Sequence, residues 1–516
     1  MANLAGHLFR QATERPDKVA LIANGRSTSY GEVCSQVRHA AGGLRDCGFS
    51  VGSRIGLMMP SRSEFIVFQH AAYALGGCVS PMNIHYRAEE IIHQARTCDL
   101  EILVIEGALL DRLPPLDDLG PQLRAVLVLD PTGPLTDARM RPAETVLAGD
   151  PIDGPVDMPP GALGLLLSTS ATTGKAKGVM LSIGNVQSNY DATPGWLGLS
   201  ERDVILCALP LYNTFGLNQC INAAMLTGCT LVLLPRFEVG AVLDAVEAHR
   251  ATFLPAVPTM LQKILSDPAT SGRNLSSIER IMVGAAPVPS VLLGRIRDAM
   301  GDDVIVIEGY GLTEATAIVT VLHVQTDADG KLLKPRSVGQ ALPGIEMMVA
   351  DEAMLAVAPG EVGEICIRGP NVMQGYYKQP EETLAAVVDG WLRTGDLGVR
   401  DADGYYTIVD RKKDVIIRGG QNIYPADIED VLYRHPAVAE VAVVAVFDEE
   451  LGEIPIAYVA FRDGQVADPE ALREMCRATL ANYKVPRRIV VLAELPKGPT
   501  GKILRRSLRD GLEMAR

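Results

Sequence analysis

The sequence lacks any long apolar run. A membrane-spanning helix requires roughly 20 consecutive apolar residues, whereas the longest apolar runs here, such as Leu163 to Leu167 and Val441 to Val446, have the length of buried strands. The N-terminal segment Met1 to Pro16 also lacks the basic and apolar regions of a secretory signal. We therefore expect no membrane span and a cytoplasmic location.

Paired cysteines and a basic stripe of the kind that binds nucleic acid are absent as well. The 62 acidic and 48 basic residues are scattered along the chain, the formal net charge is −14, and no basic stripe could neutralise a nucleic-acid backbone. The nine cysteines are odd in number and form no Cys-x-x-Cys pair. These features argue against nucleic acid as a partner and predict reduced, mostly buried thiols.

What the chain does have is the length and hydrophobicity for a large core, with 516 residues of which 47% are hydrophobic. Up to residue 340, predicted strands alternate with predicted helices, which indicates an α/β fold of doubly wound, parallel sheets. Beyond it, Gly and Pro punctuate short β-rich pieces up to Asp410, and a compact final unit follows. The predicted strands include Val19–Ala23, Arg54–Met59, Leu100–Ile105, Val204–Ala208, Thr230–Leu234, Arg280–Val283, Val304–Ile307, Ile456–Phe461 and Arg488–Leu492, and the predicted helices include Tyr30–Leu44, Glu64–Leu75, Val239–His249, Pro469–Ala481 and Lys502–Leu512.

A loop rich in Ser, Thr, Gly and Lys, from Ser168 to Val179, follows the strand Leu163–Leu167 directly. Hydroxyls, backbone amides and lysines gathered in a turn after a strand form a cradle for phosphate oxygens. The loop is not a Walker A loop, because no Gly lies five residues before Gly174 and Lys175 is followed by Ala176. Taken alone, it could equally be a solvated turn.

Three further segments have a similar character. Glu308 to Glu314 follows the strand Val304–Ile307, where glycines permit a tight turn at the strand end, Tyr310 offers a flat face to a base, and Glu314 offers a hard oxygen to Mg²⁺. Asp396 could accept hydrogen bonds from a ribose, and Arg411 could reach phosphate oxygens. The plain alternatives are a strand-end turn, a turn aspartate and a solvated run of charges.

Together the motifs resemble those of the acyl-activating, adenylate-forming superfamily of AMP-binding enzymes, and within it the acyl-CoA synthetases, such as the fatty-acid–CoA ligases. The resemblance runs nearly from end to end. Besides the loop at 168–179, it rests on Gly284-Ala285-Ala286-Pro287, Glu308-Gly309-Tyr310-Gly311, Thr313 and Glu314, the segment 363–369, Gly375-Tyr376, Thr394-Gly395-Asp396, Asp403-Gly404-Tyr405, the segments 410–414 and 419–425, and Pro496 to Lys502.

The resemblance implies a large adenylation domain at residues 1–409 and a small, mobile α+β lid at 410–516, with a hinge at Lys413 and the active site between them. It also implies two steps, in which ATP with Mg²⁺ converts an acid to acyl-AMP and the thiol of CoA then displaces AMP. Lys502 would bridge the carboxylate and the α-phosphate in the first step, and rotation of the lid would replace it by a CoA tunnel at Gly419 and Gly420.

By the same resemblance, Lys502, Glu314 and Thr313 are catalytic, Glu314 is the metal residue, and the acyl pocket contains Tyr212, Asn213 and Phe215. The implied ATP- and AMP-binding residues are Thr169, Ser170, Thr172, Thr173, Gly174, Lys177, Gly284, Ala285, Ala286, Glu308, Gly309, Tyr310, Gly311, Asp396 and Arg411.

Three positions depart from the family pattern. Ala171 stands where Gly is usual, Ala176 where Pro is usual, and Asn213 where many acyl-CoA synthetases have His. Asn213 cannot titrate, which puts any proton-linked role of that histidine in doubt. The substitution could also be neutral.

The pocket segment narrows the acid. No Asp near Tyr212 is available to pair an ammonium group, which argues against an amino acid, and the mostly apolar wall favours a fatty or aryl acid over a dicarboxylic acid. Transfer to a carrier-protein thiol or an amine, luciferase-like oxidation and a catalytically impaired homologue stay open as alternatives. So does a monomer or a homodimer. The wall residues are Tyr212, Phe215, Leu217, Ala315, Ala317 and Val319.

Overall fold

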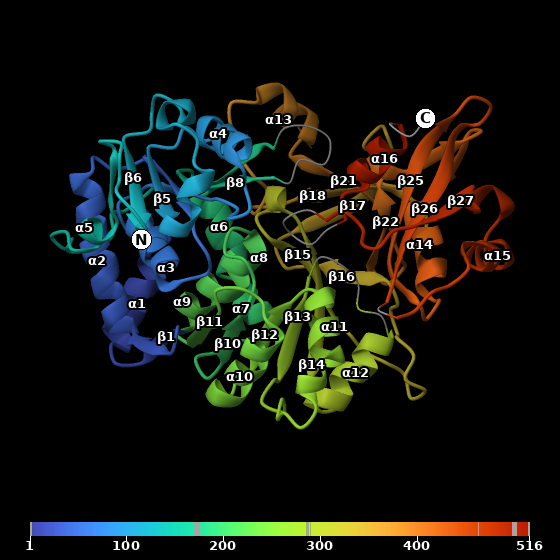
Figure 1. Ribbon diagram of the computed structural model, residues 1–516, viewed down its shortest axis with the longest axis horizontal. Helices are drawn as coiled ribbons and strands as arrows, with labels where there is room; N and C mark the ends of the chain where they lie inside the picture. Colours follow the sequence, from blue (N-terminus) through green and yellow to red (C-terminus); the bar gives the residue numbers. More distant parts are fainter. Residues whose placement is uncertain are drawn as a thin grey trace. The chain divides into compact units, whose positions relative to one another are not determined.

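The computed structural model of the protein describes residues 3–169, 176–284, 288, 290–462, 464–497 and 503–513 (Figure 1). The chain divides into two compact units. The first comprises residues 1–170, 176–347 and 367–392, and the second comprises residues 171–175, 348–366 and 393–516. The resemblance implies a different boundary, between an adenylation domain at 1–409 and a mobile lid at 410–516. That boundary stays a prediction.

One sheet of the first unit has the strand order β16-β15-β14-β13-β12-β10-β11-β1-β2. The strands from β14 to β1 pair in parallel, while β2, β15 and β16 pair antiparallel at the two ends. Strands β11, β12 and β13 are each followed by a helix, α10, α11 and α12. The strands are β1 (Val19–Ala23), β2 (Arg26–Ser29), β10 (Val204–Cys207), β11 (Thr230–Leu233), β12 (Phe253–Ala256), β13 (Arg280–Val283), β14 (Ile305–Gly311), β15 (Ile318–His323) and β16 (Ser337–Ala341).

The second sheet of this unit has eight strands in the order β19-β9-β8-β4-β3-β5-β6-β7. It is parallel from β8 to β7, and its central strands are continuous apolar runs because both faces are covered. The strands are β3 (Arg54–Met58), β4 (Cys78–Pro81), β5 (Ile102–Glu106), β6 (Ala125–Leu129), β7 (Met140–Pro142), β8 (Leu163–Ser168), β9 (Gly178–Ser182) and β19 (Gly375–Tyr376).

The helices of the first unit connect these strands in the alternating manner that the sequence predicts, which confirms the doubly wound α/β fold. They are α1 (Gly6–Glu14), α2 (Tyr30–Asp46), α3 (Ser63–Ala74), α4 (Ala88–Thr97), α5 (Glu144–Leu147), α6 (Ile183–Tyr190), α7 (Thr193–Trp196), α8 (Thr214–Gly216), α9 (Ala223–Thr227), α10 (Val239–His249), α11 (Pro258–Ser266), α12 (Ser290–Met300) and α13 (Pro380–Ala386).

The second unit contains strands that lie side by side in the order β17-β18-β21-β22, and a separate five-stranded sheet of order β24-β23-β26-β25 with β27 beside β26. Ile428, Val443 and Leu472 lie in the core of the five-stranded sheet and its helices. The elements are β17 (Glu346–Ala350), β18 (Gly363–Arg368), β21 (Trp391–Arg400), β22 (Tyr406–Arg411), β23 (Ile416–Arg418), β24 (Gln421–Ile423), β25 (Val438–Asp448), β26 (Gly452–Phe461), β27 (Arg488–Val491), α14 (Pro425–Tyr433), α15 (Pro469–Thr479) and α16 (Arg505–Glu513), and the short strand β20 (Val387–Val388) pairs with β21.

Two features of composition have structural outcomes. None of the described helices combines the length and the apolar character needed to cross a membrane. All nine cysteines are free, and Cys47 alone among them is half-buried while the others are buried, which confirms the prediction of mostly buried thiols.

Candidate active site

The predicted phosphate loop connects two antiparallel strands, β8 and β9. At its base the Thr169 N–H donates to the Lys177 carbonyl over 2.9 Å, and the Lys177 N–H donates to Thr169 Oγ1 over 3.2 Å. These bonds extend the ladder beyond the strands and hold the two ends of the loop together. The predicted residues Ser170, Thr172, Thr173 and Gly174, with Ala171 and Lys175, lie outside the described residues.

Tyr376 connects the base of this loop to the predicted magnesium residue. Strand β19 pairs with β9, which sets Tyr376 opposite Val179. Lys177 Nζ lies 4.5 Å from the centroid of the Tyr376 ring, and Tyr376 OH donates to Glu314 Oε1 over 3.1 Å. Burial and the charge of Glu314 raise the pKa of the Tyr376 phenol, so it stays a donor at neutral pH. The structure thus brings Lys177 and Glu314 together.

The Thr313–Glu314 pair lies in the connection between β14 and β15. A single 3₁₀ turn, Thr313–Ala315, follows β14, and both side chains are half-buried. The antiparallel pair Gly311 and Ile318 closes this connection. The turn therefore lies at the closed end of the β14–β15 hairpin.

The positions of Gly309 and Gly311 contradict the expected tight turn. The sequence suggests a tight turn after a strand, but both glycines lie within β14, and neither has a positive φ. A Cβ on Gly311 would lie 1.6 Å from the carbonyl oxygen of Ala317, and one on Gly309 would lie 2.4 Å from Met282 Cε. Glycine is needed at these positions for close approach of neighbouring strands and side chains rather than for a turn.

Gly284 and Glu308, of the predicted adenine pair, stand on neighbouring strands. Gly284 follows β13 directly, and Glu308 pairs with the last residue of that strand, Val283. The Glu308 side chain is buried and accepts a hydrogen bond from the Val288 N–H. Desolvation raises the pKa of Glu308 to about 7, and this hydrogen bond opposes the rise. Ala285 and Ala286 lie outside the described part of the chain.

The predicted acyl-pocket residues precede a π-helix, Leu217–Asn222, and are half-buried. A Cβ on Gly284 would lie 3.1 Å from the Phe215 ring, so the glycine leaves room for that ring. Burial raises the pKa of Tyr212 to about 12. Asn213 directly precedes α8 without capping it. Phe215 and Gly284 are therefore neighbours, as an acyl pocket beside the nucleotide site requires.

In the second unit, Asp396 and Arg411 contact each other. They are opposite residues of β21 and β22, and Arg411 Nε lies 3.0 Å from Asp396 Oδ1. The Asp396 side chain is 7% exposed and that of Arg411 is 44% exposed. Thr394 Oγ1 accepts a hydrogen bond from the Asp396 N–H over 3.1 Å. The two residues predicted to bind ribose and phosphate thus form one ion pair.

Gly419 and Gly420 form the two-residue turn between β23 and β24. Their φ angles are 54° and 81°, and the flanking residues Arg418 and Gln421 pair. Two consecutive positive φ angles in a two-residue hairpin are typical of Gly-Gly turns. Lys413 lies in the 3₁₀ turn Lys412–Asp414 before this hairpin, and burial lowers its pKa.

Lys502 lies outside the described residues, but the chain on both sides of it is tied to the second unit. Lys497 and Ile503 pair as an antiparallel bridge, and the Leu504 N–H donates to the Pro496 carbonyl over 2.8 Å. Lys497 Nζ pairs with Glu440 at 2.5 Å. On the other side, Arg505 reaches both oxygens of Glu429 at 2.8 and 2.9 Å.

Tyr376 and His93 were not among the predicted site residues. His93 Nε2 donates to the carbonyl oxygen of Ala176 over 2.6 Å, so α4 holds the C-terminal side of the phosphate loop. The Gly375-Tyr376 motif was a signal that could have identified Tyr376. A lone histidine on an amphipathic helix gives no such signal.

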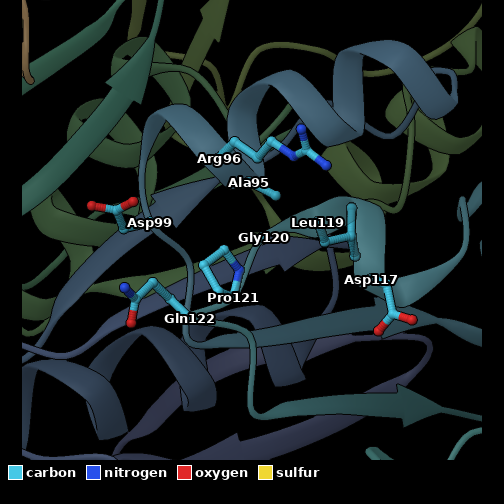
Figure 2. A pocket seen from close by; sticks show the side chains of 8 residues that line it. All are labelled: Ala95, Arg96, Asp99, Asp117, Leu119, Gly120, Pro121 and Gln122. Carbon is cyan, nitrogen blue, oxygen red and sulfur yellow. The ribbon is translucent and has the colours of Figure 1, made fainter.

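A pocket of about 400 Å³ on the first unit is lined by none of the predicted site residues (Figure 2). Two of its three charged lining side chains, Asp99 and Asp117, are acidic, and Asp99 pairs with Lys378 at 2.6 Å. The lining therefore has no surplus of positive charge that would favour phosphate. Its lining residues are Ala95, Arg96, Asp99, Asp117, Leu119, Gly120, Pro121 and Gln122.

The residues present fit Mg²⁺ bound together with a nucleotide. Within the described ranges, no group of three or more His, Cys, Asp or Glu side chains could hold a metal ion. Mg²⁺ is usually held by one or two carboxylates plus substrate phosphates and water rather than by an all-protein cage. Glu314 supplies one carboxylate beside the base of the phosphate loop, which is the donor set that this mode of binding requires.

A doubly wound α/β unit with such a loop, followed by a small α+β unit, defines the class of ATP-dependent adenylate-forming enzymes. The family model for the AMP-binding enzyme matches residues 8–377, and the model for the AMP-binding enzyme C-terminal domain matches residues 427–502. The chain belongs to the AMP-binding enzyme family.

Two curated relatives match along nearly the whole chain. A long-chain-fatty-acid–CoA ligase of Bacillus subtilis (strain 168) is 32% identical over 534 residues, which covers 98% of this chain and 93% of the relative. A feruloyl-CoA synthase of an Amycolatopsis species is 34% identical over 502 residues, which covers 97% of each.

Solved structures of o-succinylbenzoate CoA synthetase from Bacillus subtilis are also similar. The complex with its acyl-adenylate intermediate has a TM-score of 0.85 and 30% identity and covers 98% of both chains. The complex with ATP and magnesium ion has the same TM-score and identity and covers 98% of this chain and 99% of the other.

Proposed function

We propose that this chain is an ATP-dependent carboxylic acid–CoA ligase. It forms acyl-AMP and pyrophosphate in a first step, and acyl-CoA and AMP in a second. The observation that carries the proposal is the series of contacts from Lys177 through Tyr376 to Glu314, because it joins the base of a phosphate loop to a metal-binding carboxylate. The relatives that match the whole chain are themselves CoA ligases.

The first step has a clear electrostatic requirement. A carboxylate is a poor electrophile and an anionic nucleophile, so its attack on the α-phosphate needs cations and hydrogen-bond donors that stabilise the developing charge. Bound Mg²⁺ supplies positive charge to the departing pyrophosphate. The chain contributes Lys177 and Thr169 at the loop base and orients Glu314 through Tyr376. Lys502 is our proposed bridge between the acid and the α-phosphate.

In the second step the CoA thiol attacks the carbonyl carbon of the acyl-AMP anhydride. The bond from that carbon to the phosphate oxygen breaks, AMP leaves, and the thiol proton goes to solvent. Our proposal gives Lys413 the hinge role and the Gly419–Gly420 turn the role of tunnel wall, which lets one centre serve two reactions. Two consecutive glycines leave backbone without side chains at this turn, which supports a role where a slender pantetheine arm would need space.

The acid belongs to the fatty or aryl class. Phe215 beside Gly284 and the protonated phenol of Tyr212 provide an apolar wall with little charge. The relatives named for long-chain fatty acids and for feruloyl-CoA support both branches of this class. As part of the proposal, the enzyme acts in the cytoplasm, as its nine free cysteines support, and as a monomer or homodimer.

The test is acid-dependent AMP release from ATP, with and without CoA, over a panel of fatty, aryl and small branched acids, with Lys502→Ala as the blank. AMP with a matching amount of thioester supports the ligase and identifies the acid. Adenylation without thioester would favour an acyl carrier protein or an amine as acceptor. No turnover with any acid would contradict the proposal and favour a catalytically impaired homologue.

A further inference from the structure

The connection that carries Glu314 contains a strained residue. Thr316 has φ 72° and ψ −53°, and the Ala317 N–H donates to the Ala315 carbonyl over 2.9 Å. This is a γ-turn of the rare kind with positive φ. For a β-branched residue such a backbone conformation is an outlier, and glycine would adopt it far more readily. Strain of this kind persists only where the surroundings impose it.

The surroundings impose it through Asn371. The Thr316 side chain is fully buried, and its Oγ1 donates to the Asn371 carbonyl over 2.6 Å. In return, Asn371 Nδ2 donates to the Ala315 carbonyl over 3.0 Å. Asn371 is 1% exposed. The hydroxyl thus forms a bond that glycine could not form, which gives a reason for threonine at a strained position.

The segment 370–376, which contains Asn371, also contacts Glu314 directly. The Met373 N–H donates to the Glu314 carbonyl over 2.9 Å, and Tyr376 OH donates to its carboxylate. From the other side, Asn185 Nδ2 donates to the carbonyls of Pro370 and Val372 at 2.7 and 2.9 Å, which anchors the segment to α6. Segment 370–376 therefore fixes Glu314 by its backbone, by its side chain and through the turn that follows it.

The γ-turn is also closely packed on its opposite side, against β14. The Ala317 carbonyl lies where a Cβ on Gly311 would be, so β14 packs directly against the γ-turn. A relaxed turn would move this carbonyl and, with it, the closing pair of Gly311 and Ile318. The strained geometry is thus the one that fits between β14 and segment 370–376.

We propose that Thr316 and Asn371 are positioning residues that hold the Glu314 carboxylate in the orientation needed to bind Mg²⁺ together with ATP. The inference deepens the proposed function and rests on it. Both side chains are buried, and each acts through the backbone of residues 314–317. Partners that orient a metal ligand commonly change metal affinity on the order of tenfold or more when removed.

The test compares Thr316→Gly with Thr316→Ser. Glycine relieves the strain and deletes the hydroxyl, whereas serine keeps the hydroxyl, so Thr316→Gly is expected to fold and neither variant introduces a clash. The measurement is calorimetric titration with ATP in the absence of any acid, once with Mg²⁺ and once with EDTA. The ratio of the two dissociation constants reports the contribution of the metal to binding and requires no catalysis.

In Thr316→Gly, and likewise in Asn371→Ala, we expect the gain in ATP affinity from Mg²⁺ to fall on the order of tenfold, while ATP affinity in EDTA stays unchanged. Thr316→Ser should retain the gain in ATP affinity from Mg²⁺. Adding Thr316→Gly to Glu314→Gln should produce no further loss, because Thr316 acts only through the carboxylate that Glu314→Gln removes. The control Thr230→Val deletes a comparable bond to the Val19 carbonyl and should leave the gain intact.

A second readout separates positioning from general damage. Thr316→Gly should slow adenylation but not thioester formation from supplied acyl-AMP and CoA, a half-reaction that does not use the departing pyrophosphate. The inference is overturned if Thr316→Gly keeps the wild-type gain from Mg²⁺, or if it loses both half-reactions equally. If instead the wild type neither binds ATP nor adenylates any acid, the proposed function has failed.

Discussion

Tyr376 and Tyr377 are consecutive residues whose phenols each donate to a carboxylate, but we expect only Tyr376 to affect catalysis. Tyr376 OH donates to Glu314, and Tyr377 OH donates to Asp99 over 2.9 Å. Tyr376→Phe keeps the ring beneath Lys177 but leaves Glu314 Oε1 without this donor, so we expect kcat/KM for adenylation to fall on the order of tenfold. Tyr377→Phe deletes the same kind of bond away from the site and should leave adenylation unchanged. Equal losses in both variants would contradict a specific role for Tyr376.

Glu308 gives a prediction about pH. Burial raises its pKa from an ordinary 4.5 to about 7. Between these values the folded state binds a proton that the unfolded state has lost, so the stability linked to this group is full below pH 4.5 and is lost as pH rises to about 7. At 1.36 kcal/mol per pKa unit, the loss amounts to about 3 kcal/mol.

Glu308→Gln should remove this pH dependence. Urea unfolding at about pH 5 and about pH 8 would measure it, and the free energy of unfolding of the variant should rise relative to the wild type toward the higher pH. Glu382→Gln, at an exposed position on α13, is the control and should follow the wild type. Parallel curves for Glu308→Gln and the wild type would contradict the assignment.

At the scale of elements, the Gly419–Gly420 turn tests the proposed CoA wall. Gly420 has φ 81°, so Gly420→Ala should cost about 1–2 kcal/mol of unfolding free energy. It should also slow thioester formation while leaving adenylation intact, as half-reaction assays would show. Gly154→Ala, at a position with open space and no positive φ, should change stability by less than about 0.5 kcal/mol. A slower adenylation step in Gly420→Ala would exclude a role confined to CoA.

Local pattern predicted many of the elements. The strands Val19–Ala23 and Arg280–Val283 and the helix Val239–His249 have the predicted bounds, because continuous apolar runs and helical periodicity are properties of short segments. Helix α4 and strand β4 were not predicted. The function of Gly311 was misinterpreted because its neighbour, the Ala317 carbonyl, is set by a hairpin that the segment 308–314 does not reveal.

The site was predicted where it follows motifs and was missed where it depends on tertiary contacts. Glu314 and Lys177 were predicted as site residues from residue type and position, and the structure gives them a common neighbour. The residue that joins them, Tyr376, comes from a strand pairing with β9 that composition does not reveal. The role of Asn371 was missed for the same reason. An asparagine after Gly-Pro is expected to be a turn residue, whereas its side chain donates to the Ala315 carbonyl in the connection between β14 and β15.

At the scale of the whole molecule, we expect substitutions of Lys502 and Lys413 to impair opposite half-reactions. Lys502→Ala should abolish adenylation and leave thioester formation from supplied acyl-AMP largely intact. Lys413→Pro should do the reverse by restricting the hinge. Single-turnover assays of each half-reaction measure both effects, with Lys413→Ala as the control that removes the charge but keeps the backbone free. If both variants lost both half-reactions equally, the rotation of the lid would be contradicted.

The ion pairs that flank Lys502 bear on the same prediction. Lys497 with Glu440, and Arg505 with Glu429, attach both sides of the segment to the second unit. Lys497 and Arg505, the charged residues on either side of Lys502, are thus both held by carboxylates of that unit.

The placement of the thiols makes the protein a convenient subject for spectroscopy. Maleimide dyes react with accessible thiolates, and Cys47 of the first unit is the one cysteine that is not buried. Burial raises the pKa of its thiol, so labelling is slow at neutral pH and faster in mild alkali. A single added cysteine at Val466, which is 86% exposed in the second unit, would complete a pair of fluorophores whose energy transfer reports whether the separation of the two units changes during turnover.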